Sequence, residues 1–188
     1  MLKTEIEQAL AVLKNGGVIL YPTDTIWGLG CDATNAAAVE KINQLKGRSA
    51  DKSFIVLLDS ESKLPGYVSE IPEVAYDLIA YAEHPLTIIF SGAKNLAANV
   101  VSTDGSVGIR IVRHEFVQGL LQRFRKPITS TSANLSGQPS PGSFDEIAQE
   151  IKDGADYIVD WEQDLHSPKK ASTIMKLGPS GQFSFIRK

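Results

Sequence analysis

Residues 54–58 read Phe-Ile-Val-Leu-Leu, an apolar run with no polar residue inside it. A run of this kind is typical of a β-strand that other elements cover on both faces. Just upstream, Val39, Ile42 and Leu45 recur at helical spacing, and Gly47 ends that pattern. Because helical and strand patterns intermingle in this way, the chain is expected to be an α/β protein with helices flanking a sheet.

The rest of the chain continues this alternation. Helices are expected over 4–14 with Thr4 as cap, from Thr34 or Asn35 to Gly47, from Pro72 through Ala82, over 115–124, and from a Ser143 cap through Phe144 to about Lys152. Strands are expected at 18–21, 54–58, 86–90, 107–111, 128–132 and 157–159, and in a closing hairpin of 172–177 with 182–186. The hairpin is antiparallel, so the sheet is expected to be mixed.

Length and composition point to one compact domain over residues 1–188, since a domain takes roughly 150 residues. The chain is 43% hydrophobic and 22% charged, which is typical of a globular protein rather than a disordered chain or a fibre. The single cysteine, Cys31, excludes an internal disulfide and a cysteine-based zinc site. With no signal-peptide pattern and no run long enough to cross a bilayer, a cytoplasmic protein with no membrane partner is expected.

Charge and motif absences exclude several common functions. The net charge of −3 counts against a protein held to duplex nucleic acid mainly by phosphate contacts. No phosphate-binding P-loop occurs, and residues 28–30, Gly-Leu-Gly, lack the third glycine of a dinucleotide fingerprint. His84, His114 and His166 are too scattered to indicate a local metal motif, so no protein side chain is predicted to bind metal. No nucleophile elbow of the G-x-S-x-G kind is present either.

Polar side chains cluster at three places directly beside apolar segments. Residues 21–30, Tyr-Pro-Thr-Asp-Thr-Ile-Trp-Gly-Leu-Gly, place hydroxyls, including that of Thr25, and a carboxylate after a strand. Glycines there would allow a ligand to approach the backbone closely. Read alone, this segment is better explained as an ordinary strand-to-turn transition.

The second place is residues 46–52, Lys-Gly-Arg-Ser-Ala-Asp-Lys. Lys46, Arg48 and Lys52 are hinged at a glycine and can surround a polyphosphate, with arginine gripping oxygens bidentately. The alternative is a solvated helix C-terminus, where cations interact favourably with the helix dipole. In isolation that alternative is slightly favoured.

The third place is residues 129–140, Thr-Ser-Thr-Ser-Ala-Asn-Leu-Ser-Gly-Gln-Pro-Ser. The strand expected at 128–132 leads directly into this segment. By the period of two, Ser130, Ser132 and Asn134 are expected on one face, as neutral donors for phosphate oxygens. The alternative, a cluster of serine and threonine residues in a turn, poorly explains so many hydroxyl side chains at the end of a strand. Separately, Arg110 lies in an apolar strand, where a lone cation needs either a structural partner or an anionic ligand.

Taken together, several segments follow one another in a recognisable order. They are YPTDTIWGLGCDA, KGR-x-x-x-K, PLTIIF, VGIRIVRH, PITSTSANLSGQPSP and ASTIMKL. This succession resembles the YrdC-like (TsaC-type) threonylcarbamoyl-AMP synthase family in its short, single-domain form, and it spans nearly the whole chain. The resemblance implies a YrdC/RibB-like twisted mixed sheet with flanking helices and a concave basic cavity.

The resemblance also implies an activity. The enzyme would be a nucleotidyltransferase that makes L-threonylcarbamoyladenylate and pyrophosphate from L-threonine, bicarbonate or CO2, and ATP. The product would serve threonylcarbamoyladenosine modification of tRNA. Downstream tRNA threonylcarbamoyl-transferase components would be partners of the enzyme, and the enzyme would bind tRNA weakly. Mg²⁺ would enter with the ATP phosphates.

Site residues follow from the motif positions of the resemblance. The signature tetrad matches Lys46, Arg48, Ser132 and Asn134, to which catalysis is assigned. ATP-binding positions match Arg48, Lys52, Ser132, Asn134, Ser140 and Arg187, and threonine-binding positions match Thr25, Arg110, Ser130 and Ser172. Departures occur at Ser49, Leu57 and Glu83-His84, which bear on loop shape and amino-acid selectivity.

Two other readings remain. The first is a double-stranded RNA- or tRNA-binding module without catalysis, against which the negative net charge and scarce aromatic residues count. The second is a carbamoyl-adenylate enzyme similar to the related domain of hydrogenase-maturation proteins. That domain uses carbamoyl phosphate within a much larger chain.

Overall fold

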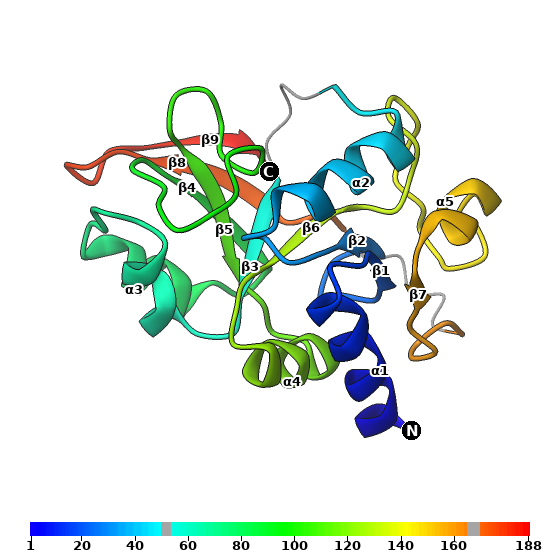
Figure 1. The fold of residues 1–188 in the computed structure, drawn as a ribbon. Helices are drawn as coiled ribbons and strands as arrows, with labels where there is room; N and C mark the ends of the chain where they lie inside the picture. Colours follow the sequence, from blue (N-terminus) through cyan, green and yellow to red (C-terminus); the bar gives the residue numbers. More distant parts are fainter. Residues whose placement is uncertain (50–53, 165–169) are drawn as a thin grey trace.

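The computed structural model describes residues 1–49, 54–164 and 170–188, and it shows helices around one nine-stranded sheet (Figure 1). Its helices are α1 (Leu2–Lys14), α2 (Ala36–Lys46), the 3₁₀ helix η1 (Glu61–Gly66), α3 (Val74–Tyr81), α4 (Glu115–Phe124) and α5 (Gln149–Gly154). Its strands are β1 (Ile19–Tyr21), β2 (Gly28–Gly30), β3 (Ile55–Leu58), β4 (Leu86–Phe90), β5 (Val107–Ile111), β6 (Ile128–Ser132), β7 (Tyr157–Ile158), β8 (Thr173–Leu177) and β9 (Phe183–Arg187). The strand order is β7-β1-β2-β6-β3-β5-β4-β8-β9.

The apolar strand β3 lies inside the sheet, as its sequence predicts. It pairs in parallel with β5 and antiparallel with β6, so both of its edges are hydrogen-bonded. The β8–β9 hairpin is antiparallel, whereas β4 and β8 are parallel. The predicted mixed α/β sheet is therefore confirmed.

Strand register decides which side chains share a face. Leu57 pairs with Ile128 on one side and with Arg110 on the other, and Arg110 pairs with Thr87. Thr87 in turn pairs with Ile174. Because directly paired residues point to the same face of a sheet, these side chains form one row across the centre of the molecule.

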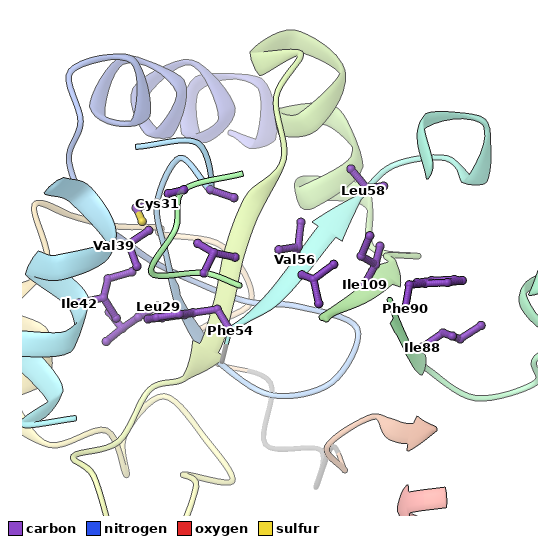
Figure 2. Close-up of a cluster of buried hydrophobic side chains, with 14 of the residues drawn as sticks. Leu29, Cys31, Val39, Ile42, Phe54, Val56, Leu58, Ile88, Phe90 and Ile109 are labelled. Carbon is purple, nitrogen blue, oxygen red and sulfur yellow. The ribbon is translucent and has the colours of Figure 1, made fainter. Parts of the chain in front are cut away.

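The opposite face of the sheet carries the larger hydrophobic core, which α2 and α3 cover. Figure 2 shows part of it, with Leu29, Val39, Ile42, Val56 and Ile109 in one cluster. Each of these side chains is almost completely buried. This core fixes the sheet from behind and leaves the other face available.

A second core covers only part of that other face. Helices α1 and α4 lie side by side there (Figure 1), and Leu13 and Leu120 pack with Leu57 and Ile128. Arg110 and Thr87 are in the same row as Leu57 but outside this core. The part of the face outside this core carries polar side chains among apolar ones, and it is where the cavity described below lies.

Two helices begin at residues other than those that the sequence predicts. Helix α1 begins at Leu2, so Thr4 lies within it, and no side chain caps it. The helix predicted from Phe144 begins only at Gln149. Phe144 instead packs on Trp27 with ring centroids 4.9 Å apart, and Glu146 accepts a hydrogen bond from the Gly142 amide. At α2 the expected cap is confirmed, because Asn35 accepts from the amides of the first turn.

Strand β2 is not predicted by the sequence, because glycine is a poor strand former. In the structure its glycines allow a close approach. A Cβ on Gly30 would lie 2.4 Å from the Thr129 carbonyl oxygen and 2.8 Å from the ring of Tyr21. The hydroxyl of Tyr21 donates to that same Thr129 oxygen at 3.0 Å. Glycine thus makes room for the buried ring between two strands.

Candidate functional site

A cavity of about 260 Å³ opens on the uncovered part of the sheet face. The predicted site residues that line it are Thr25, Arg48, Arg110, Ser130, Ser132, Ser140, Ser172 and Arg187. They come from segments far apart in the sequence, namely the β1–β2 connection, the end of α2, strands β5, β6 and β9, and the start of β8. The fold therefore brings the three polar segments and the terminal hairpin to one place.

Arg110 is the most deeply placed charged group of the cavity. It is 3% exposed, and its Nη2 lies 3.2 Å from Asp24 Oδ1. This contact does not have hydrogen-bond geometry, and among the described residues Nε and Nη2 have no hydrogen-bond partner. Buried donors without acceptors are costly, so this guanidinium is suited to bind an anionic ligand.

Next to it, the β8–β9 hairpin supplies a second guanidinium. Arg187 donates from Nε to the Ser172 carbonyl oxygen at 3.0 Å, and Ser172 shares a 2.8 Å hydroxyl contact with Thr87. Partial desolvation of this otherwise exposed side chain, together with the positive charge of Arg110, lowers the pKa of Arg187. The two cations repel each other, which favours binding of an anion near both.

Thr25 is positioned by its neighbour Thr23. The Thr23 hydroxyl donates to the Ile26 carbonyl oxygen at 2.8 Å, and it lies 2.9 Å from Thr25 Oγ1. Because a hydroxyl has a single hydrogen, Thr25 is the donor between the two threonines. Its oxygen therefore presents lone pairs, which suit a ligand N–H or O–H group.

Arg48 follows Gly47, which ends α2 in a left-handed conformation. Its Nη1 donates to Thr131 Oγ1 at 2.8 Å, and its Cζ lies 4.4 Å from the ring centre of Phe54. Burial lowers the pKa of this guanidinium. Arg48 is thus held between Thr131 of β6 and Phe54, just before β3, in the wall of the cavity, where it can meet a phosphate.

The other two tetrad residues lie beside the cavity and not in its wall. The Lys46 ammonium donates to the backbone carbonyl oxygens of Ser132 and Asn134. Asn134 donates from Nδ2 to the carbonyl oxygens of Leu135 and Gln138, at 2.9 and 2.7 Å. The expected common face of Ser130, Ser132 and Asn134 is therefore wrong for Asn134, because β6 ends at Ser132. Lys46 and Asn134 therefore hold the end of β6 and the loop that follows it.

The sequence did not predict every residue of the cavity, and one predicted residue lies outside the part of the chain that the structure describes. Thr87, Ser102 and Thr131 also line the cavity. A signal for Thr87 was present, since it is a polar residue in an apolar strand, as Arg110 is. Lys52 lies outside the described residues.

No metal centre was predicted from the protein side chains. Across residues 1–49, 54–164 and 170–188, no three His, Cys, Asp or Glu side chains gather around one point. No helix in these ranges is long and apolar enough to cross a bilayer.

The fold and the site together define the class of this protein. It is an α/β protein that carries an arginine-lined cavity on one face of its sheet. A family model of the Sua5/YciO/YrdC domain, described as telomere recombination, matches residues 11–188. The chain belongs to the Sua5/YciO/YrdC family. It is 35% identical over 175 residues to a threonylcarbamoyl-AMP synthase of Pseudoalteromonas translucida, covering 92% of each chain.

Solved structures agree with this assignment. The crystal structure of P. abyssi Sua5 complexed with L-threonine matches with a TM-score of 0.82 and 29% identity, over 92% of this chain. The match spans only 50% of that Sua5 chain. The structure of E. coli YciO matches with a TM-score of 0.81 over 100% of this chain and 90% of its own, and at 24% identity it supports the fold alone. The predicted YrdC-like fold is confirmed.

Proposed function

We propose that this protein is an L-threonylcarbamoyladenylate synthase. It would make threonylcarbamoyl-AMP and pyrophosphate from L-threonine, bicarbonate or CO2, and ATP. The observation that carries the proposal is the buried Arg110, with N–H groups lacking hydrogen-bond partners among the described residues, inside a cavity lined by hydroxyls and further arginines. The names of its relatives, and the L-threonine in the P. abyssi Sua5 structure, support the same reaction.

The amino acid is assigned to the deep end of the cavity. Arg110 pairs with the threonine carboxylate, since a guanidinium matches a carboxylate in shape and charge. The Thr25 oxygen accepts a hydrogen bond from the amine or hydroxyl of the substrate. Ser130 and Ser172 line the same cavity and are proposed to orient the remaining polar groups of the substrate.

The nucleotide is assigned to the remaining polar residues of the cavity. Arg48 and Arg187 supply positive charge, and the hydroxyls of Ser132 and Ser140 offer donors to phosphate oxygens. Arg187, which binds Ser172, lies between the two proposed subsites. Lys46 holds the end of β6 through the Ser132 carbonyl oxygen, from outside the cavity. Lys52 is proposed to join this group.

The reaction follows from this placement. The neutral amine nitrogen of threonine bonds to the carbon of CO2 and loses a proton, which gives a carbamate. A carbamate oxygen then bonds to the α-phosphorus of ATP while the bond to the pyrophosphate oxygen breaks. Both reactants are anions, so the protein contributes mainly positioning and charge neutralisation.

The cavity side chains fit phosphate oxygens better than a cation. The lining consists of hydroxyls, guanidinium groups and apolar side chains, and no carboxylate is among its described members. Mg²⁺ is therefore proposed to arrive bound to the ATP phosphates, where it supplies charge neutralisation. The residues above then position the nucleotide that carries it.

The product is proposed to serve threonylcarbamoyladenosine modification of tRNA in the cytoplasm, through downstream transferase components. The decisive experiment measures pyrophosphate release from ATP with threonine, serine or no amino acid, each with and without bicarbonate. Release that depends on both threonine and bicarbonate is expected. Release without an amino acid, or no release under any condition, would overturn the proposal.

A further inference from the structure

Asp24 lies behind Arg110, outside the wall of the main cavity. It lines a smaller cavity of about 200 Å³, together with Glu83, His84 and Arg113. The side chain is 9% exposed, and its Oδ1 lies 3.2 Å from Arg110 Nη2. Asp24 is thus a counter-ion for the cation at the base of the proposed amino-acid subsite, and it does not reach the substrate itself.

A neighbouring backbone group restrains this carboxylate. The Arg113 amide donates to Asp24 Oδ2 at 3.2 Å. The Arg113 side chain is anchored in turn, because it donates to the carbonyl oxygens of Ile79 and Ala82 at the end of α3, at 2.8 and 3.0 Å. One carboxylate oxygen is therefore engaged away from Arg110.

This restraint affects what Arg110 can bind. A free aspartate pairs with arginine through two parallel hydrogen bonds, which would use the N–H groups that a substrate carboxylate needs. Here Oδ1 is close enough to compensate the charge, yet Nε and Nη2 keep no hydrogen-bond partner among the residues described. The charge of Arg110 is balanced while its donors stay available.

We propose that Asp24 is a positioning residue that, held by the Arg113 amide, orients Arg110 for a threonine carboxylate and limits its affinity for other anions. This inference rests on the proposed function. Without Asp24, Arg110 carries an uncompensated charge beside Arg187 and attracts any small anion, but its N–H groups lose their fixed direction. Selectivity between an oriented amino acid and a simple carboxylate would then fall.

The test compares wild type with Asp24→Asn and Asp24→Glu, using titration calorimetry with L-threonine, ATP and sodium acetate. The Asn variant keeps the size of the side chain, and the Glu variant keeps its charge but changes its reach. Asp32→Asn is the matched control, since Asp32 is also buried and paired, with Lys126 at 2.7 Å, away from the cavity. Thermal unfolding of each variant shows that it is folded.

For Asp24→Asn, threonine affinity is expected to fall roughly ten- to hundredfold, with ATP affinity within about twofold of wild type and acetate affinity unchanged or raised. Asp24→Glu is expected to lose threonine affinity as well, and Asp32→Asn is expected to match wild type. An equal fall for threonine and acetate would show a merely structural Asp24 and overturn the inference, as would unchanged threonine binding. If wild type itself fails to bind threonine, the proposed function fails and the inference fails with it.

Discussion

The ammonium group of Lys46 donates a hydrogen bond to the backbone carbonyl oxygen of Ser132. The last residue of α2 thereby fixes the loop that follows β6. Ser132 lines the cavity and Lys46 does not, so the lysine affects the proposed nucleotide site through the backbone that it binds.

Replacing Lys46 by alanine is expected to lower the rate of pyrophosphate release by about 10²–10³, because the loop donors lose their position and the site loses a positive charge. Lys41→Ala is the matched control, since Lys41 lies on the same helix but donates to the Gly16 carbonyl oxygen instead. Steady-state assays of both variants make the comparison. Full threonine- and bicarbonate-dependent activity in Lys46→Ala would refute the assigned role.

Replacing Arg110 by alanine is expected to raise the KM for threonine much more than the KM for ATP, since Arg110 is assigned to the amino-acid carboxylate. The loss of a charge-assisted bidentate contact corresponds to roughly tenfold or more in affinity. Arg123→Ala, at an exposed position on α4, serves as the control. Equal losses for both substrates would identify Arg110 as structural.

Gly30→Ala is expected to reduce the free energy of unfolding by about 3 kcal/mol, because the new methyl group would collide with the Thr129 carbonyl oxygen and the Tyr21 ring. Gly66→Ala is the matched control, since a Cβ there meets nothing within 4 Å. Urea denaturation of both variants gives the two values. A Gly30→Ala protein as stable as wild type would show that the two strands can separate without cost.

Cys31 is expected to resist alkylation in the native protein. Burial raises the pKa of its thiol to about 12, so the thiolate fraction at pH 8 falls to roughly 10⁻⁴. Because the folded pKa lies above that of the unfolded chain, the stabilisation from this group is present at neutral pH and is lost as the pH rises from about 9 toward 12. Mass spectrometry after iodoacetamide treatment, with and without urea, tests this. Native labelling as fast as in urea contradicts it.

Threonine binding is expected to change little with salt, because the ligand is a zwitterion held in a cavity. A protein that bound RNA through six or more phosphate contacts would lose about 10³ or more in affinity between roughly 50 and 200 mM salt. Titrations of threonine and of a tRNA at both salt concentrations distinguish the two. Tight, salt-sensitive tRNA binding without threonine binding would favour the RNA-binding module.

Local patterns predicted most of the strands and several helices. The apolar run at 107–111 predicted strand β5. Arg110 stood out within it because a cation in an apolar strand needs a partner. Strand β2 was not predictable, because only the buried Tyr21 ring makes glycines favourable at its positions. The early start of the helix near Phe144 was wrong because packing on Trp27 outweighs local helix preference.

Site prediction depended in the same way on tertiary structure. The alternation rule placed Ser130 and Ser132 correctly in the cavity wall. It failed for Asn134, because the strand ends two residues earlier, at Ser132, and the amide side chain binds its own loop. Asp24 lies in a polar segment of the sequence, but its contact with Arg110 depends on the β1–β2 connection meeting strand β5, which no local pattern shows.

The β8–β9 hairpin has one more consequence. Strand β9 forms the edge of the sheet and all of its residues are exposed, yet it carries Arg187 into the cavity. Edge strands with few buried contacts open at a lower free energy than the whole protein. Fraying of this hairpin would therefore remove Arg187 from the wall of the cavity, and so from the proposed nucleotide site, while both hydrophobic cores stay folded. Occupancy by ATP should in turn slow amide hydrogen exchange in β9, so that ligand binding and local order at the sheet edge are thermodynamically linked.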